Sequence, residues 1–242
     1  MKRIKVVILG VIIAALFSSL FGCSMTDNSA VDAVTDELSN KYEKTFVISD
    51  LGNRFNYDTT TMYVYAADDP SMRFVVRVNS NGEIVFENYA YRKVCSKVRN
   101  IICDIFSEYN LETVCVAEFS KYNYDISAEA SIEEYIEASN ADIVKAAIAV
   151  KSDEILTGEI LEKIYMDIGS QISEIPIGFS MYIISEEDYT KVFKDIENRT
   201  SYFGIGDIRA YGVTPVTDFY VEINDGQLSE TITEINEELL NR

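Results

Sequence analysis

The chain contains no histidine and no tryptophan, and only 3 of its 242 residues are proline. Without histidine it has no Ser-His-Asp or Cys-His pair, no His-containing zinc motif and no imidazole to shuttle protons near neutral pH. Enzyme classes that depend on histidine are therefore excluded. The remaining composition, 48% hydrophobic and 25% charged, is that of an ordinary globular protein.

Basic residues are also scarce, because 21 Lys and Arg stand against 40 Asp and Glu, which gives a formal net charge of −19. Such an acidic surface repels phosphate backbones and anionic lipid headgroups. We therefore expect no nucleic-acid partner. The acidic clusters fall on helix faces and first turns, and none has the ligand spacing of a calcium loop or the glycines of a nucleotide loop. The sequence thus predicts no metal site, no cofactor and no identifiable catalytic residue.

Residues 1–22 have the layout of a secretory signal. Lys2, Arg3 and Lys5 precede an apolar run over residues 6–17. This run is about a dozen residues long, whereas a membrane-spanning helix needs ~20. A short N-terminal transmembrane anchor is the alternative interpretation.

Leu20, Gly22 and Cys23 end this segment. The Leu-x-Gly-Cys pattern, placed after a complete signal, resembles the lipobox of bacterial lipoproteins, although Phe21 is bulkier than is usual there. The resemblance implies cleavage between Gly22 and Cys23 and acylation of the Cys23 thiol, with chains such as palmitate. It places the protein on the extracytoplasmic face of the cell membrane, held by the lipid, with residues 23–30 as a tether. Loss of the three basic residues of the signal would change the net charge to −22.

Three further cysteines, Cys95, Cys103 and Cys115, are an odd number for a disulfide framework. Cys95 and Cys103 lie eight residues apart on one predicted helix, about 12 Å along its axis, which is too far for a disulfide. Cys115 lies on the next predicted strand and could meet either of them. We favour free thiols, with Cys103 the most reactive because it lies on the polar side of its helix.

Hydrophobic spacing predicts an α+β fold: an antiparallel meander with flanking helices, followed by a second small α/β-type layer. Residues 31–120 form the first predicted module, with helices over 31–43 and 90–108, strands at 46–48, 63–66, 73–78 and 84–86, and a last strand at 112–119. Residues 121–130 are expected to be a linker or surface loop, whose cleavage would leave two folded fragments. The competing interpretation is one continuous sheet, in which the strand at 113–119 pairs with a strand of the second module. Residues 131–242 form the second predicted module, which begins at a capping box from Ser131 to Glu134 and ends in a helix from Leu228 to Leu239. Gly204 and Gly206 are expected to lie in a loop.

Three motifs of the first module carry a second resemblance. They are Lys41-Tyr-Glu-Lys-Thr-Phe46, then Asp69-Pro followed by Phe74-x-Val76-x-Val78, and Glu87-Asn-Tyr89. With these motifs, residues 35–110 resemble a module of small uncharacterised lipoproteins and secreted proteins of Gram-positive anaerobes. Glu43 stands where that pattern has glycine. The resemblance implies a fold and a compartment, and no activity.

Tyrosine is abundant, with 16 residues. Tyr57, Tyr63 and Tyr65 fall together on the first meander, and Tyr122 and Tyr124 lie at the expected linker. Tyrosines on a sheet face can stack on sugars or hold peptides, although they can also simply pack at a sheet edge. We therefore interpret the protein as a non-enzymatic surface binding module for a protein or glycan partner. The alternatives are a cell-wall hydrolase that works without histidine and a structural component of an envelope assembly.

Overall fold

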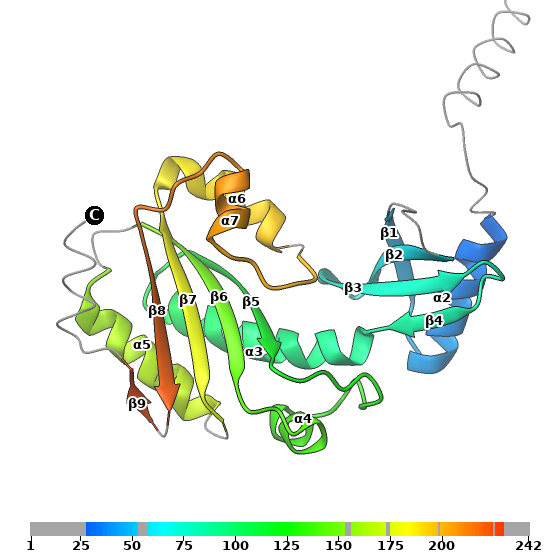
Figure 1. Ribbon diagram of the computed structural model, residues 1–242, viewed down its shortest axis with the longest axis horizontal. Coiled ribbons are helices and arrows are strands. Elements are labelled where there is room, and N and C mark those ends of the chain that lie inside the picture. Colours follow the sequence, from blue (N-terminus) through cyan, green and yellow to red (C-terminus); the bar gives the residue numbers. More distant parts are fainter. Residues whose placement is uncertain are drawn as a thin grey trace, which may run out of the picture.

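A computed structural model describes residues 28–52, 58–152, 156–172, 175–197, 199–224 and 226–229. Within these ranges two β-sheets lie at opposite ends of the molecule and one long helix, α3, joins them (Figure 1). The predicted α+β class is confirmed. None of the described helices is long and apolar enough to cross a bilayer.

The elements follow one another along the chain with short connections. In order they are α2 (Asn28–Tyr42), β1 (Phe46–Leu51), β2 (Thr59–Ala66), β3 (Asp69–Asn79), β4 (Ile84–Glu87), α3 (Tyr89–Glu108), β5 (Thr113–Phe119), α4 (Ile132–Ser139), β6 (Val144–Lys151), α5 (Gly158–Gln171), β7 (Ile177–Ile184), α6 (Glu186–Glu197), α7 (Ile205–Ala210), β8 (Thr217–Asn224) and β9 (Gln227–Leu228).

The first sheet is an antiparallel meander in the order β1-β2-β3-β4. Its strands alternate, so that one face is buried against α2 and the start of α3 while the other faces outward. The buried face forms a small core, which consists of Val34, Leu38, Phe46, Met62, Val64, Ala66, Met72, Phe74, Val76, Val78 and Tyr89. Gly82, with φ of +86°, closes the β3–β4 turn in a conformation that favours glycine, as the Asn-Gly signal predicts.

The second sheet has the order β5-β6-β7-β8-β9, and only β6 and β7 run parallel. Helices α3, α4 and α5 cover one face and enclose the largest core. Helices α6 and α7 cover part of the other face, where Val192, Ile196 and Ile208 pack on strand residues such as Val116 and Ala147 (Figure 1). Both faces of the central strands are therefore buried.

Strand β5 corrects the predicted division of the chain. It pairs with β6 at seven positions, from Thr113↔Val150 to Phe119↔Val144, so it belongs to the second sheet. Its assignment to the first module is therefore wrong. The physical reason is that Val114, Cys115, Val116 and Ala117 are all buried, and a strand buried on both faces needs helices on both sides.

The segment from Lys121 to Ala130 is packed against the two cores instead of linking them freely. Ala130 is buried in the second core and Ile126 packs against it, while Ala128 packs against the first core. The Tyr135 hydroxyl also donates to the Lys121 carbonyl at 2.9 Å. The expected linker thus contacts the cores of both sheets.

Two other predictions have different outcomes. Gly204 and Gly206 do not lie in an open loop, because the short helix α7 begins at Ile205, and the Asp207 carboxylate accepts from the Gly204 N–H at 2.8 Å.

The signal over residues 1–22, Cys23 and Tyr57 lie outside the described residues. So does the predicted closing helix beyond residue 229.

Candidate functional site

Tyr63 and Tyr65 lie on the outward face of β2, half-buried, as their alternation with the buried Met62 and Val64 requires. They are opposite Val75 and Arg73 of β3, respectively. Tyr57, the third tyrosine of the predicted binding face, is outside the described part of the chain. The structure therefore brings two of the three predicted residues together.

A second group of rings adjoins this face at β4. Arg77 is opposite Phe86 across the β3–β4 ladder, and its guanidinium lies 5.1 Å from the centre of the Phe86 ring. The Phe86 ring meets Tyr124 edge to face, with 5.0 Å between the ring centres. Tyr122 and Tyr124 are stacked, with 5.9 Å between ring centres and 12° between ring planes. We call Arg77, Phe86, Tyr122 and Tyr124 the aromatic surface.

The aromatic surface is exposed although its rings are large. Tyr122 is 55% and Tyr124 37% exposed to solvent. Partial burial raises the pKa of both phenols, so the rings remain neutral hydrogen-bonding groups at physiological pH. Arg77 is exposed and makes no ion pair within the described ranges, whereas Arg73 on the same strand pairs with Asp50 at 2.8 Å. The surface thus combines flat apolar rings with an unpaired positive charge.

Buried aromatic residues hold these exposed rings in place. Tyr91 of α3 touches both Tyr122 and Tyr124, with ring centres 5.1 and 5.9 Å apart. Its hydroxyl accepts a hydrogen bond from the Phe119 N–H at 3.3 Å. Asn123 lies between Tyr122 and Tyr124 in the sequence, and its N–H donates to the Tyr135 hydroxyl at 2.8 Å. The loop that carries the rings is therefore fixed by α3, α4 and β5.

A groove of about 310 Å³ continues the aromatic surface along the free edge of β4. It lies between this strand, helix α2 and the loop of Tyr124, and Leu38, Val85 and Phe86 supply its apolar lining. Glu37, Lys41 and Asp125 supply charges of both signs. The groove and the ring surface together form an extended, open and rigidly held site.

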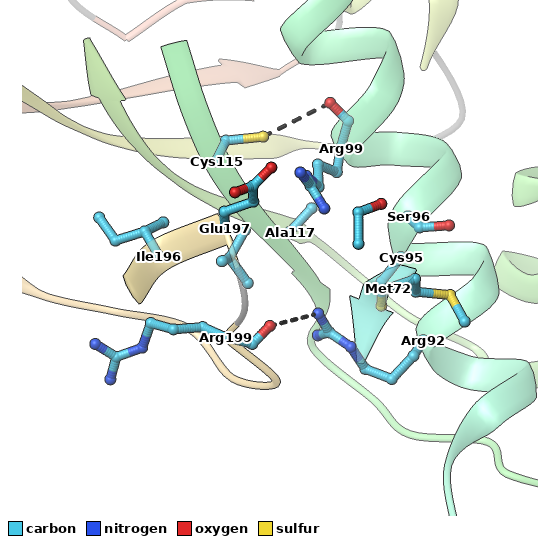
Figure 2. A pocket seen from close by; sticks show the side chains of 12 residues that line it. Met72, Arg92, Cys95, Ser96, Arg99, Cys115, Ala117, Ile196, Glu197 and Arg199 are labelled. Atoms are coloured by element: carbon cyan, nitrogen blue, oxygen red, sulfur yellow. Dashed lines mark hydrogen bonds between the residues drawn. The ribbon is translucent and has the colours of Figure 1, made fainter. Parts of the chain in front are cut away.

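An interior pocket between α3, β5 and the end of α6 is the other concentration of reactive groups (Figure 2). Its open volume of about 10 Å³ is room for roughly one water molecule. Arg92 is only 7% exposed, and its guanidinium donates to the Arg199 carbonyl at 3.3 Å, which ties the segment after α6 to α3. Nε and Nη1 of Arg92 have no partner among the described residues. Because the pocket is so small, it suits a buried water better than a substrate.

The three thiols are distributed unevenly around this pocket. Cys95 and Cys115 are buried and line it, while Cys103 is half-buried on the next turns of α3. The Cys103 and Cys115 sulfur atoms are 3.5 Å apart, and all three residues are free thiols. Burial raises the pKa of Cys95 to about 11, which makes it a poor nucleophile.

Where the pKa of an acidic side chain departs from its ordinary value, it is lowered, chiefly by hydrogen bonds, at Asp68, Glu133, Asp142, Asp188 and Asp207. No group of three or more potential metal ligands occurs in the described ranges.

Comparison with known proteins supports the fold and leaves the activity open. No family model matches the chain, and no curated protein matches it. Among solved structures, the chain is similar to a DUF5037 family protein from Ruminococcus gnavus, with a TM-score of 0.67 and 14% sequence identity. The match covers 84% of this chain and 95% of that one. At this identity the likeness shows a shared fold.

The sequence predicts the binding face on β2 and leaves out Tyr122 and Tyr124, which it places at the expected linker. Tyr122 and Tyr124 stand in a segment without apolar periodicity, which predicted a linker. Their alternation at residues 122 and 124 is the one signal that puts both rings on the same side.

Proposed function

We propose that the protein is a lipid-anchored extracytoplasmic binding module that holds an acidic, glycan-containing polymer on its aromatic surface. The observation that carries the proposal is the stacked and exposed pair of Tyr122 and Tyr124, which Phe86 connects to Arg77, a residue with no ion pair in the described part of the chain. Aromatic faces bind the apolar faces of sugar rings, and a guanidinium binds carboxylates and phosphates in two-point contact.

The charge distribution supports an acidic ligand at this place. The chain as a whole is strongly acidic and would repel an anionic polymer at a random position. Arg73 and Arg77 lie four residues apart on the outward face of β3, next to Tyr63, Tyr65 and Phe86. An anionic polymer is therefore expected to meet this face selectively.

A lipid on Cys23 would hold the ligand face near the membrane. Cys23 precedes the first residue of α2, Asn28, by five residues, which can span at most about 18 Å. Helix α2 packs on the first sheet, so an acyl chain on Cys23 would keep the ligand face close to the bilayer. Cell-wall glycans that carry peptide carboxylates are acidic polymers of the expected kind in that space.

Co-sedimentation with purified peptidoglycan tests the proposal. Tyr122→Ala and Arg77→Ala should each weaken binding by about tenfold, as expected for one lost stacking or charged contact. Tyr220→Ala is the matched control, because Tyr220 is 47% exposed on β8 of the other sheet. Equal binding by all four proteins, or none by the wild type, would exclude this ligand surface.

The anchor is tested separately in cells. Cys23→Ala should leave an unlipidated precursor that retains residues 1–22, whereas the wild type should begin with an acylated Cys23. Mass spectrometry of the N-terminal peptide distinguishes the two, and an acylated N-terminus in the variant would disprove lipidation at Cys23.

A further inference from the structure

Cys103 and Cys115 come from different elements yet meet at their sulfur atoms. Cys103 lies on α3 and Cys115 on β5, and the two Sγ atoms are 3.5 Å apart, within hydrogen-bonding distance for thiols. Cys115 Sγ is also 3.6 Å from the Arg99 carbonyl, to which it can donate. Cys95 lies eight residues before Cys103 on the same helix and makes no such contact with it. The pairing is therefore specific to two of the three thiols.

The two thiols differ in their access to solvent. Cys103 is half-buried and borders an open hollow of about 490 Å³, whereas Cys115 is fully enclosed. Thr113 and Tyr189 line the same hollow, and their buried hydroxyl oxygens have no hydrogen-bond partner among the described residues. Of the two thiols, Cys103 is thus the one that a small molecule in the hollow can reach.

The hydrogen bond between the thiols also separates their acidities. It lowers the pKa of Cys103, while the same contact together with burial raises the pKa of Cys115. The more accessible sulfur is thus the one that ionises first. Because the thiolate is the nucleophile in exchange reactions, both properties select Cys103 as the attacking group.

We propose that Cys103 and Cys115 are a redox-active pair, in which Cys103 attacks a small-molecule disulfide and Cys115 then closes an internal disulfide. In the first step the Cys103 thiolate bonds to one sulfur of the reagent, whose S–S bond breaks and releases a thiolate. In the second step the Cys115 sulfur, after losing its proton, bonds to Cys103 Sγ and expels the second thiolate. Overall two protein thiols are oxidised, and one reagent disulfide is reduced to two thiols.

The resulting bond would join α3 directly to β5. Helix α3 contributes to the cores of both sheets, through Tyr89 in the first and Ile102 in the second. An extracytoplasmic compartment is oxidising and favours the closed form. The pairing itself follows from the geometry of α3 and β5 and does not depend on the aromatic surface.

Exchange with glutathione disulfide tests the pair in the intact chain. After reduction and removal of the reductant, the wild type should form a Cys103–Cys115 cross-link, seen by peptide mapping after alkylation in denaturant. Cys115→Ser should instead accumulate one glutathionyl group on Cys103. Cys103→Ser should form neither product at a comparable rate, and Cys95→Ala, the matched control on the same helix, should behave like the wild type.

Alkylation rates of the three thiols in the native wild type test the proposal without a variant. In the reduced protein, N-ethylmaleimide should label Cys103 at least tenfold faster than Cys95 or Cys115, and after oxidation neither Cys103 nor Cys115 should be labelled. Three results would overturn the proposal. They are a Cys95–Cys115 cross-link in the wild type, any internal cross-link in Cys103→Ser that forms as fast as in the wild type, and a wild type that stays glutathionylated without forming an internal disulfide.

Discussion

Glu87 joins three elements through one carboxylate. It accepts hydrogen bonds from Lys41 Nζ at 2.6 Å, from the Tyr42 hydroxyl, and from the Tyr89 N–H at 2.7 Å. Its side chain is only 9% exposed. The motif Glu87-Asn-Tyr89 thus has a structural role. Strand β4 ends at Glu87, α3 begins at Tyr89, and the Glu87 carboxylate binds the end of α2.

Replacement of Glu87 should therefore destabilise the first sheet. Glu87→Ala leaves the partly buried Tyr42 hydroxyl without its acceptor, and we expect it to lower the free energy of unfolding by about 1–3 kcal/mol. Glu137→Ala, at an exposed position of α4, should change it by less than about 0.5 kcal/mol. Urea unfolding followed by circular dichroism measures both, and equal effects would show that the three bonds contribute nothing.

The Cys95 thiol should make the stability depend on alkaline pH. Its pKa is raised from 9.0 to about 11 by burial. Between these values the unfolded chain has lost the proton while the native chain keeps it, so stability falls as pH rises. Between pH 8 and 10.5 we expect the free energy of unfolding to fall by about 2 kcal/mol more in the wild type than in Cys95→Ala.

The comparison of the two proteins under reducing conditions isolates this effect. Buried tyrosines such as Tyr135 also keep their protons at alkaline pH, chiefly because of burial, and the variant leaves them buried. Parallel stability curves for the two proteins would mean that Cys95 ionises normally in the native state.

At the scale of single elements, α4 shows how a local signal sets a boundary. The Ser131 hydroxyl accepts from the Glu134 N–H at 3.1 Å, and the Glu134 carboxylate accepts from the Ser131 N–H at 2.7 Å. The capping box predicted from the sequence is therefore confirmed. Its two bonds satisfy two N–H groups that the start of a helix leaves free.

Loss of this cap should cost a measurable amount of stability. Ser131→Ala removes the acceptor for the Glu134 N–H and should lower the free energy of unfolding by about 1 kcal/mol. Ser131→Asp keeps an acceptor at the same place and should restore most of that loss. A thermal or urea titration in which the two variants unfold alike would show that the cap is not what begins α4.

Most elements could be predicted because their signals are local. Alternation predicted β3 from Arg73 to Val78, and helical spacing predicted α3 within a residue or two. Helix α7 was missed because Gly204 and Gly206 have poor helix propensity, and it is stabilised from a distance by Arg199, which donates to Asp207 at 2.6 Å. The aromatic surface likewise depends on contacts between distant parts of the chain, because Phe86 and Tyr124 are far apart in the sequence and meet only in the fold.

At the scale of the whole molecule, the pairing of β5 decides where the chain divides. A strand carries the same local signal whether it extends the first sheet or begins the second, so the sequence could not place β5. The structure pairs it with β6, and α3 covers the same core through Val98, Ile102 and Ile105. The boundary between the two sheets therefore lies near Asn88, at the start of α3, instead of at residues 121–130.

This boundary predicts which fragments of the chain fold alone. A fragment of residues 88–242 keeps α3, β5 and the whole second sheet with its core, and we expect it to unfold cooperatively, although less stably than the full chain. A fragment of residues 121–242 lacks α3 and β5, so β6 keeps only β7 as a partner and becomes an edge strand, and much of the largest core is exposed. We expect this fragment to aggregate or remain unfolded.

Circular dichroism and urea unfolding of the two purified fragments decide between the two divisions. A sharp transition for residues 88–242 together with none for residues 121–242 would support a boundary at α3. Cooperative unfolding of the shorter fragment would instead restore the division at the segment from Lys121 to Ala130. Cleavage within that segment in the intact protein should leave both pieces associated, because the β5–β6 ladder and the α3 core hold them together without a covalent link.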